Sequence, residues 1–145
     1  MKHLFFYGVL LAEVASERIT AMLVGLGPGR SATAPGMLYA VPDARGWYPV
    51  LLPAEQFGNG FVRGMVQEAG SVDFAALDRF EGVDPHDPRA GEYRREPIRV
   101  APEAGEPLMA DAYLYNREPE PTFEQIPHGD FARWLRETGR AALAG

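Results

Sequence analysis

The chain has 145 residues, of which 46% are hydrophobic and 11% aromatic, enough to build one core in a single domain spanning residues 1–145. Its 14 basic and 20 acidic residues give a formal net charge of −6, and no basic run is longer than the pair Arg94–Arg95, so we expect no nucleic-acid partner. The sequence contains no cysteine, which excludes disulfides, thiolate nucleophiles and zinc–thiolate sites.

The first predicted element is a strand at residues 3–8, "HLFFYG", whose nearly continuous apolar run is typical of a strand buried on both faces. The apolar N-terminus superficially looks like a signal peptide, but Gly8 interrupts it and Glu13 and Glu17 follow. No segment reaches the roughly 18 apolar residues of a membrane span. We therefore expect a cytoplasmic protein without a membrane partner.

Residues 11–23 have loose helical spacing, and the glycine-rich segment 25–29 ends this predicted helix. The pattern then changes to short apolar runs separated by turn residues. Five further strands are predicted at residues 32–41, 47–52, 61–68, 93–100 and 109–115.

Two later stretches predict helices. Residues 72–80 carry apolar side chains along one side and are followed by Gly82, a typical C-terminal stop. Residues 130–143 begin with Asp130, a good N-cap. Six short strands with a few peripheral helices predict an α+β fold, either a small mixed or antiparallel six-stranded β-barrel or a strongly curved mixed sheet.

Most familiar catalytic patterns are missing from the sequence. The histidines His3, His86 and His128 lack paired metal-ligand spacing, so we expect no metal site. The stretch "GLGPGR" at 25–30 has the wrong glycine spacing for a dinucleotide fingerprint, and we expect no cofactor. There is no G-x-S-x-G elbow to supply a serine nucleophile.

Two features remain as candidates. In "FYGVLL", a glycine after a buried strand frees backbone N–H groups to converge on an anion, with the Tyr7 hydroxyl beside them, although a plain strand and turn would look the same. In "LDRFEGV", Glu81 occupies the C-terminal end of a helix, where the dipole disfavours an anion. Glu81 is either a surface carboxylate or, if it faces an apolar cavity, a general base with a raised pKa.

The order of short motifs along the chain resembles the γ-glutamyl cyclotransferase-like family, in its short bacterial branch, from residue 4 to about residue 136. The motifs that carry the resemblance are "FFYGVLL", "APGMLYAV", "WYPVLL", "FVRGMVQEA", "ALDRFEGV", "YRREPIRV", "AYLYN" and "IPHGDFARWL". The resemblance implies a small mixed barrel with a cavity at one end. It also implies release of 5-oxoproline from a small γ-glutamyl amide or amine, without a protein nucleophile, metal or cofactor.

The resemblance assigns roles to particular residues. Glu81, in the family's D-x-x-E-G motif, is implied as the general acid/base. Tyr7, Gly8, Val9 and Leu10 correspond to the family's Y-G-[S/T]-L turn, whose backbone N–H groups hold the substrate. This chain departs from the pattern at Val9, which replaces a hydroxyl-bearing residue.

Strand alternation supplies two further candidates. Tyr113 and Tyr115 share one face of the last predicted strand with Met109 and Asp111, so both tyrosines are candidate cavity residues, barrel core being the alternative. Asp130 is expected to be a structural N-cap.

Two other functions stay open beside the enzyme. Val9 favours a non-catalytic module that binds a small ligand on the same barrel. A purely structural assembly protein is the third reading, and it would lack an open polar pocket. Substrate specificity is expected to lie in the loops at 84–91 and 117–127, and the sequence indicates no oligomeric state.

Overall fold

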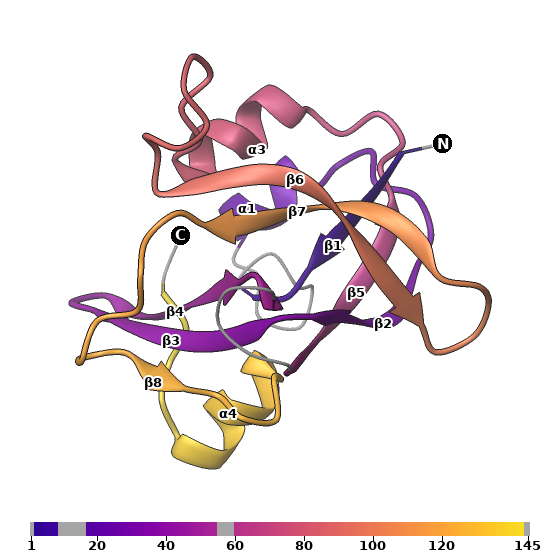
Figure 1. Cartoon of the computed structure of the whole chain (residues 1–145). Coiled ribbons are helices and arrows are strands. Elements are labelled where there is room, and N and C mark those ends of the chain that lie inside the picture. The colour runs from indigo at the N-terminus through magenta and orange to yellow at the C-terminus, as the bar shows by residue number, and fades with distance from the viewer. Residues whose placement is uncertain (1, 9–16, 55–59, 144–145) are drawn as a thin grey trace.

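The computed structural model describes residues 2–8, 17–54 and 60–143. Its centre is a closed barrel of five strands, in the order β1-β5-β2-β6-β7 (Figure 1). The five strands are β1 (His3–Phe6), β2 (Gly29–Pro35), β5 (Phe61–Glu68), β6 (Tyr93–Pro102) and β7 (Leu108–Tyr115). Neighbouring strands are antiparallel except β1 and β7, which close the barrel in parallel.

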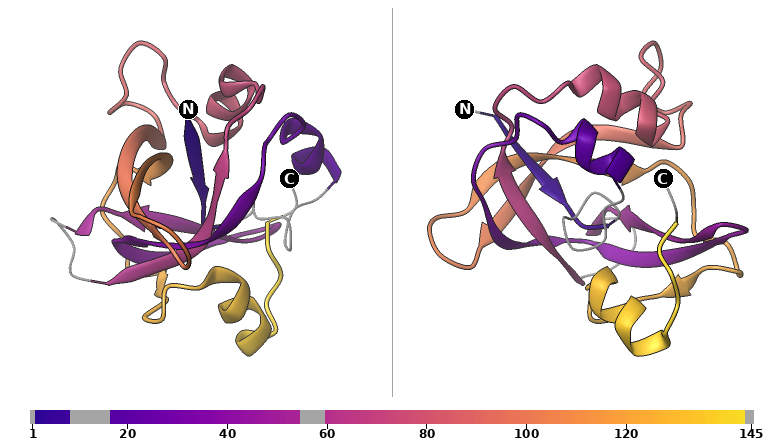
Figure 2. Two further views of the ribbon diagram at one scale, coloured as in Figure 1. Left: turned by 90° about the vertical axis from the view of Figure 1, so that its right-hand side faces the viewer. Right: turned by 180° about the vertical axis from the view of Figure 1, so that it is seen from behind.

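A second sheet with the order β4-β3-β8 packs beside the barrel (Figure 2). Its strands are β3 (Met37–Asp43), β4 (Gly46–Leu52) and β8 (Glu124–Gln125). The single strand predicted at 32–41 is therefore two strands, β2 in the barrel and β3 in the second sheet. They divide at Gly36, whose φ of 154° and close approach to Leu51 leave no room for a side chain.

Three helices are described: α1 (Glu17–Met22), α3 (Phe74–Glu81) and α4 (Phe131–Thr138). The helices α3 and α4 lie at opposite ends of the molecule (Figure 1). The Asp130 carboxylate accepts a hydrogen bond from the Arg133 N–H at 3.0 Å, as expected of an N-cap. None of these helices has the length and apolar character needed to cross a membrane.

The helix α4 is shorter than the predicted 130–143 because Gly139 adopts a left-handed conformation with φ 71°. Beyond Gly139 the chain runs along the edge of β4. The Trp47 N–H donates to the Ala141 carbonyl at 2.9 Å, and the Leu143 N–H donates to the Trp47 carbonyl at 2.8 Å. Arg140 stacks over the ring of Trp47 at 4.4 Å, so this C-terminal segment is fixed against the second sheet.

The strand β1 is buried on both faces, as its sequence predicts. Phe5 belongs to one core cluster, inside the barrel, where small side chains such as Ala34 and Ala112 leave room for it. Leu4 and Phe6 belong to the other cluster, which includes side chains from the second sheet and from α3. The two clusters meet along β1, so Tyr7 and Gly8, which follow this strand, lie between the barrel and the second sheet.

The predicted α+β barrel is confirmed, with a closed mixed barrel of five strands rather than six. The difference arises because the strand predicted at 47–52 pairs with β3 and not with the barrel.

Candidate active site

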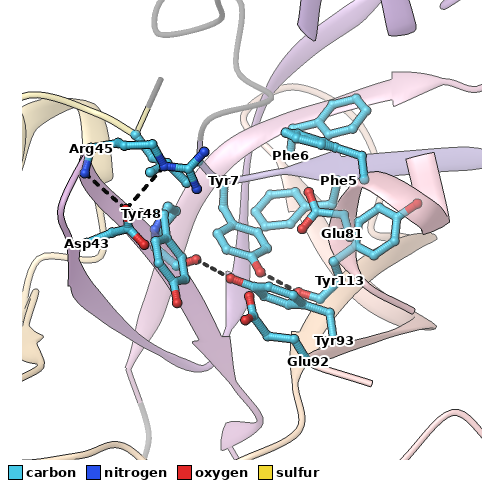
Figure 3. Close-up of a pocket in the computed structure, with 14 residues that line it drawn as sticks. Phe5, Phe6, Tyr7, Asp43, Arg45, Tyr48, Glu81, Glu92, Tyr93 and Tyr113 are labelled. Carbon is cyan, nitrogen blue, oxygen red and sulfur yellow. Dashed lines mark hydrogen bonds and ion pairs between the residues drawn. The ribbon is translucent and has the colours of Figure 1, made fainter. Parts of the chain in front are cut away.

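A cavity of about 200 Å³ opens where the end of β1 meets the second sheet and α3 (Figure 3). Its inner wall is largely aromatic, and carboxylates and one arginine lie around it. The lining residues are Phe5, Phe6, Tyr7, Gly8, Asp43, Arg45, Tyr48, Pro49, Phe80, Glu81, Glu92, Tyr93, Tyr113 and Leu143.

Glu81 is the last residue of α3 and reaches this cavity because the helix is stopped there. Asp73 caps the first turn by accepting a hydrogen bond from the Ala76 N–H at 3.1 Å, and Leu77 is fully buried beneath the helix. At the other end Gly82 is left-handed with φ 74°, and its N–H donates to the Arg79 carbonyl at 3.2 Å.

The surroundings of Glu81 disfavour its ionised form. Burial, the largest cause, and the nearby carboxylates of Glu92 and Asp78 together raise the pKa of Glu81 from 4.5 to about 8. Within the described residues, Glu81 forms no ion pair that would lower its pKa. A carboxyl group with a pKa near 8 can exchange protons in either direction close to neutral pH.

Three tyrosines with buried rings hold the walls of the cavity together. The Tyr7 hydroxyl donates to the carbonyl of Tyr113, and the Tyr93 hydroxyl donates to the carbonyl of Pro49 at 2.9 Å (Figure 3). The Tyr113 hydroxyl donates to the Asp78 carboxylate at 2.8 Å. Burial raises the pKa of all three, with the charge of Glu81 contributing, so each hydroxyl remains a proton donor in these bonds.

Gly8 lies in the cavity wall, closely packed against Pro49. A Cβ atom at this position would stand 2.1 Å from the Pro49 Cγ and 2.9 Å from its Cδ. Gly8 therefore passes against Pro49 of β4 at a distance that only glycine allows.

Four of the predicted site residues meet in the cavity: Tyr7, Gly8, Glu81 and Tyr113. Val9 and Leu10 lie outside the described residues. Tyr115 does not line the cavity, which corrects the expectation for this residue. It faces Tyr93 across the β6–β7 pair, edge to face at 5.8 Å between ring centroids, and Tyr93 lines the cavity in its place.

Several lining residues come from segments that sequence reasoning did not connect to the site. Asp43, Arg45 and Tyr48 belong to the β3–β4 hairpin, and Leu143 to the C-terminal segment. Alternation along 47–52 places Tyr48 on one face, but it does not say that this face meets α3. No residue of the loops 84–91 and 117–127, where specificity was expected, lines the cavity.

The arginine pair of β6 lies outside the cavity. Arg94 is buried and donates to Glu96 at 2.9 Å and to Asn116 at 2.8 Å. Arg95 points to the opposite side and binds Asp78 and Asp111. Across the described ranges, no three histidine or acidic side chains come together as metal ligands.

The cavity does not fit the reading of a purely structural protein, which predicts no open polar pocket. Comparisons with known proteins are consistent with this. A family model described as "Gamma-glutamyl cyclotransferase, AIG2-like" matches residues 4–134. A search of curated proteins gave no match.

Solved structures show the same fold at low sequence identity. An uncharacterized protein from Pyrococcus horikoshii superposes with a TM-score of 0.60 at 18% identity, covering 96% of this chain and 97% of that one. An AIG2-like protein from Mus musculus gives 0.60 at 23% identity, covering 90% of this chain and 94% of that one. A protein described as a gamma-glutamyl cyclotransferase gives a TM-score of 0.59 at 19% identity, covering 86% of this chain and 69% of that one. Since the family model spans nearly the whole chain, this protein belongs to the gamma-glutamyl cyclotransferase, AIG2-like family.

Proposed function

We propose that this protein is an enzyme of the γ-glutamyl cyclotransferase type, with Glu81 as its general acid/base. The substrate is a small γ-glutamyl amide or amine, which the enzyme converts to 5-oxoproline and a free amine. The observation that carries the proposal is a carboxyl group with a pKa of about 8 inside a cavity formed by the family's motifs.

The reaction needs two protons to leave the α-ammonium of the substrate and two to reach the leaving nitrogen. Ionised Glu81 takes a proton from the substrate's α-ammonium, and the freed amine attacks the γ-carbonyl carbon of the same glutamyl group. Glu81 passes this proton to the leaving nitrogen and the C–N bond to it breaks. The ring nitrogen then gives up its second proton, which also reaches the released amine, so the amine departs as an ammonium ion and the lactam is neutral. Atoms and charge balance without a protein nucleophile.

Two features of the cavity favour this chemistry. The reacting amine and carbonyl belong to one molecule, so folding the glutamyl chain against the aromatic wall supplies much of the rate. The positive α-ammonium beside Glu81 lowers its pKa in the complex, which increases the ionised fraction when substrate arrives. The backbone N–H groups of the turn at Tyr7, Gly8, Val9 and Leu10 are proposed to hold the substrate.

The test is a mass-spectrometric assay of 5-oxoproline with a panel of γ-glutamyl amino acids and amines. Glu81→Gln should lower turnover by at least about 10²-fold, the usual scale for loss of a general base. Glu106→Gln, an exposed position in the β6–β7 turn, is the matched control and should leave turnover unchanged. Full turnover by Glu81→Gln would show that Glu81 is not the base.

Val9 keeps a non-catalytic binding module as the second candidate, because the turn lacks the family's hydroxyl at this position. In that case a γ-glutamyl compound raises the melting temperature without forming 5-oxoproline. The variant Val9→Ser separates the two functions further: turnover that appears only with serine would identify Val9 as the cause of a lost activity.

A further inference from the structure

An ionic cluster centred on Arg95 joins α3 to the barrel, and Asp78, Arg95 and Asp111, which form it, are not among the residues that line the cavity. The Arg95 Nε donates to the Asp78 Oδ1 at 2.9 Å, and its Nη2 donates to the Oδ2 at 3.3 Å. The third contact of the same guanidinium runs from Nη1 to the Asp111 Oδ2 at 2.6 Å. One planar side chain on β6 therefore holds a carboxylate of α3 and a carboxylate of β7 in fixed relative positions.

The cluster is enclosed by further contacts. The Arg95 guanidinium lies over the ring of Phe74, in the first turn of α3, at 4.5 Å from the ring centroid. The Lys2 ammonium lies 3.4 Å from the Asp111 Oδ2 and 5.2 Å from the Phe74 ring centroid. Asp111 is buried, so its position depends on these two cations.

The same cluster reaches the cavity by two routes. Asp78 precedes Glu81 by three residues, so fixing Asp78 fixes the turn of helix that carries Glu81. Asp78 also accepts the hydroxyl of Tyr113, and the carbonyl of Tyr113 accepts the hydroxyl of Tyr7. Glu81, Tyr113 and Tyr7 all line the cavity.

The helix is short, and its orientation depends on this cluster together with its apolar face. It is eight residues long, which is too short to be stable by itself, and Leu77 is the residue within it that is fully buried. Phe74 and Phe80 are partly buried and pack against the same core cluster as Leu77, so the helix has one short apolar face. The forked contact between Arg95 and Asp78 adds a polar restraint on the rotation of the helix about its axis.

We propose that Arg95 is a positioning residue, which clamps Asp78 to the barrel and thereby sets the orientation of Glu81 in the cavity. This inference rests on the proposed function of Glu81. Arg95 does not touch the cavity, so its effect on the reaction is transmitted through α3.

The clamp also has an electrostatic consequence. The groups that face Glu81 are Glu92 from the segment just before β6, Asp78 from its own helix, and the tyrosines Tyr7, Tyr93 and Tyr113. Asp78 raises the pKa of Glu81, and Arg95 partly neutralises Asp78. Removing the charge of Asp78 should therefore lower the pKa of Glu81, and removing Arg95 should raise it.

The experiment combines two readouts on Asp78→Asn, Arg95→Gln, Arg95→Lys and the double variant Asp78→Asn/Arg95→Gln. The pKa of Glu81 is followed by NMR of ¹³C-labelled glutamate side chains in the absence of substrate, with Glu81→Gln to assign the signal. The kcat and KM for 5-oxoproline formation are measured against pH. Arg63→Gln, which breaks an exposed ion pair with Glu103 on another face of the barrel, is the matched control.

We expect the pKa of Glu81 to fall in Asp78→Asn and to rise in Arg95→Gln, and to return toward the wild-type value in the double variant. We also expect kcat to fall by about tenfold or more in Arg95→Gln, Arg95→Lys and the double variant, with KM changed less, since small displacements of a reacting group have large effects on rate. Arg95→Lys keeps the charge without the fork, so loss of kcat with little change in pKa supports positioning.

Two results would overturn the proposal: a pKa of Glu81 unchanged in all variants, or kcat values within twofold of wild type once the folded fraction is measured by urea titration. Because the NMR titration needs no turnover, it also separates this inference from the proposed function. A wild type that forms no 5-oxoproline refutes the reaction, whereas the shifts of the Glu81 signal still decide whether Arg95 controls its surroundings.

Discussion

Replacing the proposed catalytic carboxylate should make the folded protein more stable, and the gain should grow with pH. Glu81 is ionised at neutral pH in the unfolded chain, where its pKa is ordinary, but it is held largely protonated in the folded protein. The variant Glu81→Gln keeps the shape and hydrogen-bonding capacity of the protonated side chain without the ionisable group. The variant therefore removes the free-energy cost of keeping this carboxyl group protonated in the folded protein, and it creates no cavity.

The magnitude follows from the raised pKa. Burial and the neighbouring carboxylates raise the pKa of Glu81 from 4.5 to about 8, and each tenfold change in proton affinity corresponds to about 1.4 kcal/mol. Between these two values the folded state binds a proton that the unfolded state has lost, so stability falls as pH rises through this window. The cost of Glu81 is about 1 kcal/mol at pH 5 and on the order of 3–5 kcal/mol at pH 9.

The assay is urea unfolding of wild type and Glu81→Gln, monitored by circular dichroism at five pH values from about 5 to 9. The difference in the free energy of unfolding should favour the variant, widen as the pH rises to about 8, and level off above that value. Glu106→Gln, an exposed control in the β6–β7 turn, should show a small difference that does not change with pH. A constant difference between Glu81→Gln and wild type would mean that Glu81 is not held in its protonated form, and the argument for its role as a base would fail with it.

Two further predictions concern Gly8, in the cavity wall, and the N-cap of α4, at the other end of the molecule. Gly8→Ala should lower kcat/KM for 5-oxoproline formation by about 10²-fold, because its Cβ would meet the Pro49 Cγ at 2.1 Å and displace the turn from β4; a fully active variant would show that this turn does not hold the substrate. Asp130→Ala should lower the free energy of unfolding by about 1 kcal/mol in urea titrations, because the Arg133 N–H loses its capping partner. Its turnover should be that of the wild type at equal folded protein, and a larger loss would assign Asp130 a role beyond capping.

Features encoded within a few consecutive residues were predictable from the sequence. The stop of α3 at Gly82, the N-cap at Asp130 and the two buried faces of β1 each depend on local patterns of three to six residues. The end of α4 at Gly139 belongs to the same class, since this glycine is visible in the sequence, although the prediction extended the helix to residue 143.

Features that depend on which segments meet in space were not predictable from one sequence. The apolar run at 32–41 gives no sign that its two halves enter different sheets, because the reason is the contact of Gly36 with Leu51 on β4. The candidate site shows the same limit. Glu81, Tyr7 and Gly8 could be named from local motifs, but Tyr48, Tyr93 and Leu143 join them only through the packing of β4, β6 and the C-terminal segment.

The anchoring of the C-terminal segment has a spectroscopic consequence. The chain has 2 tryptophans, Trp47 and Trp134, and both lie in the cluster that holds this segment, with ring centroids 5.3 Å apart. The Arg140 guanidinium contacts both rings, three residues before Leu143 enters the cavity wall. Intrinsic tryptophan fluorescence therefore reports on this one corner of the molecule, and a ligand that moves Leu143 should change the emission while the barrel strands remain unchanged.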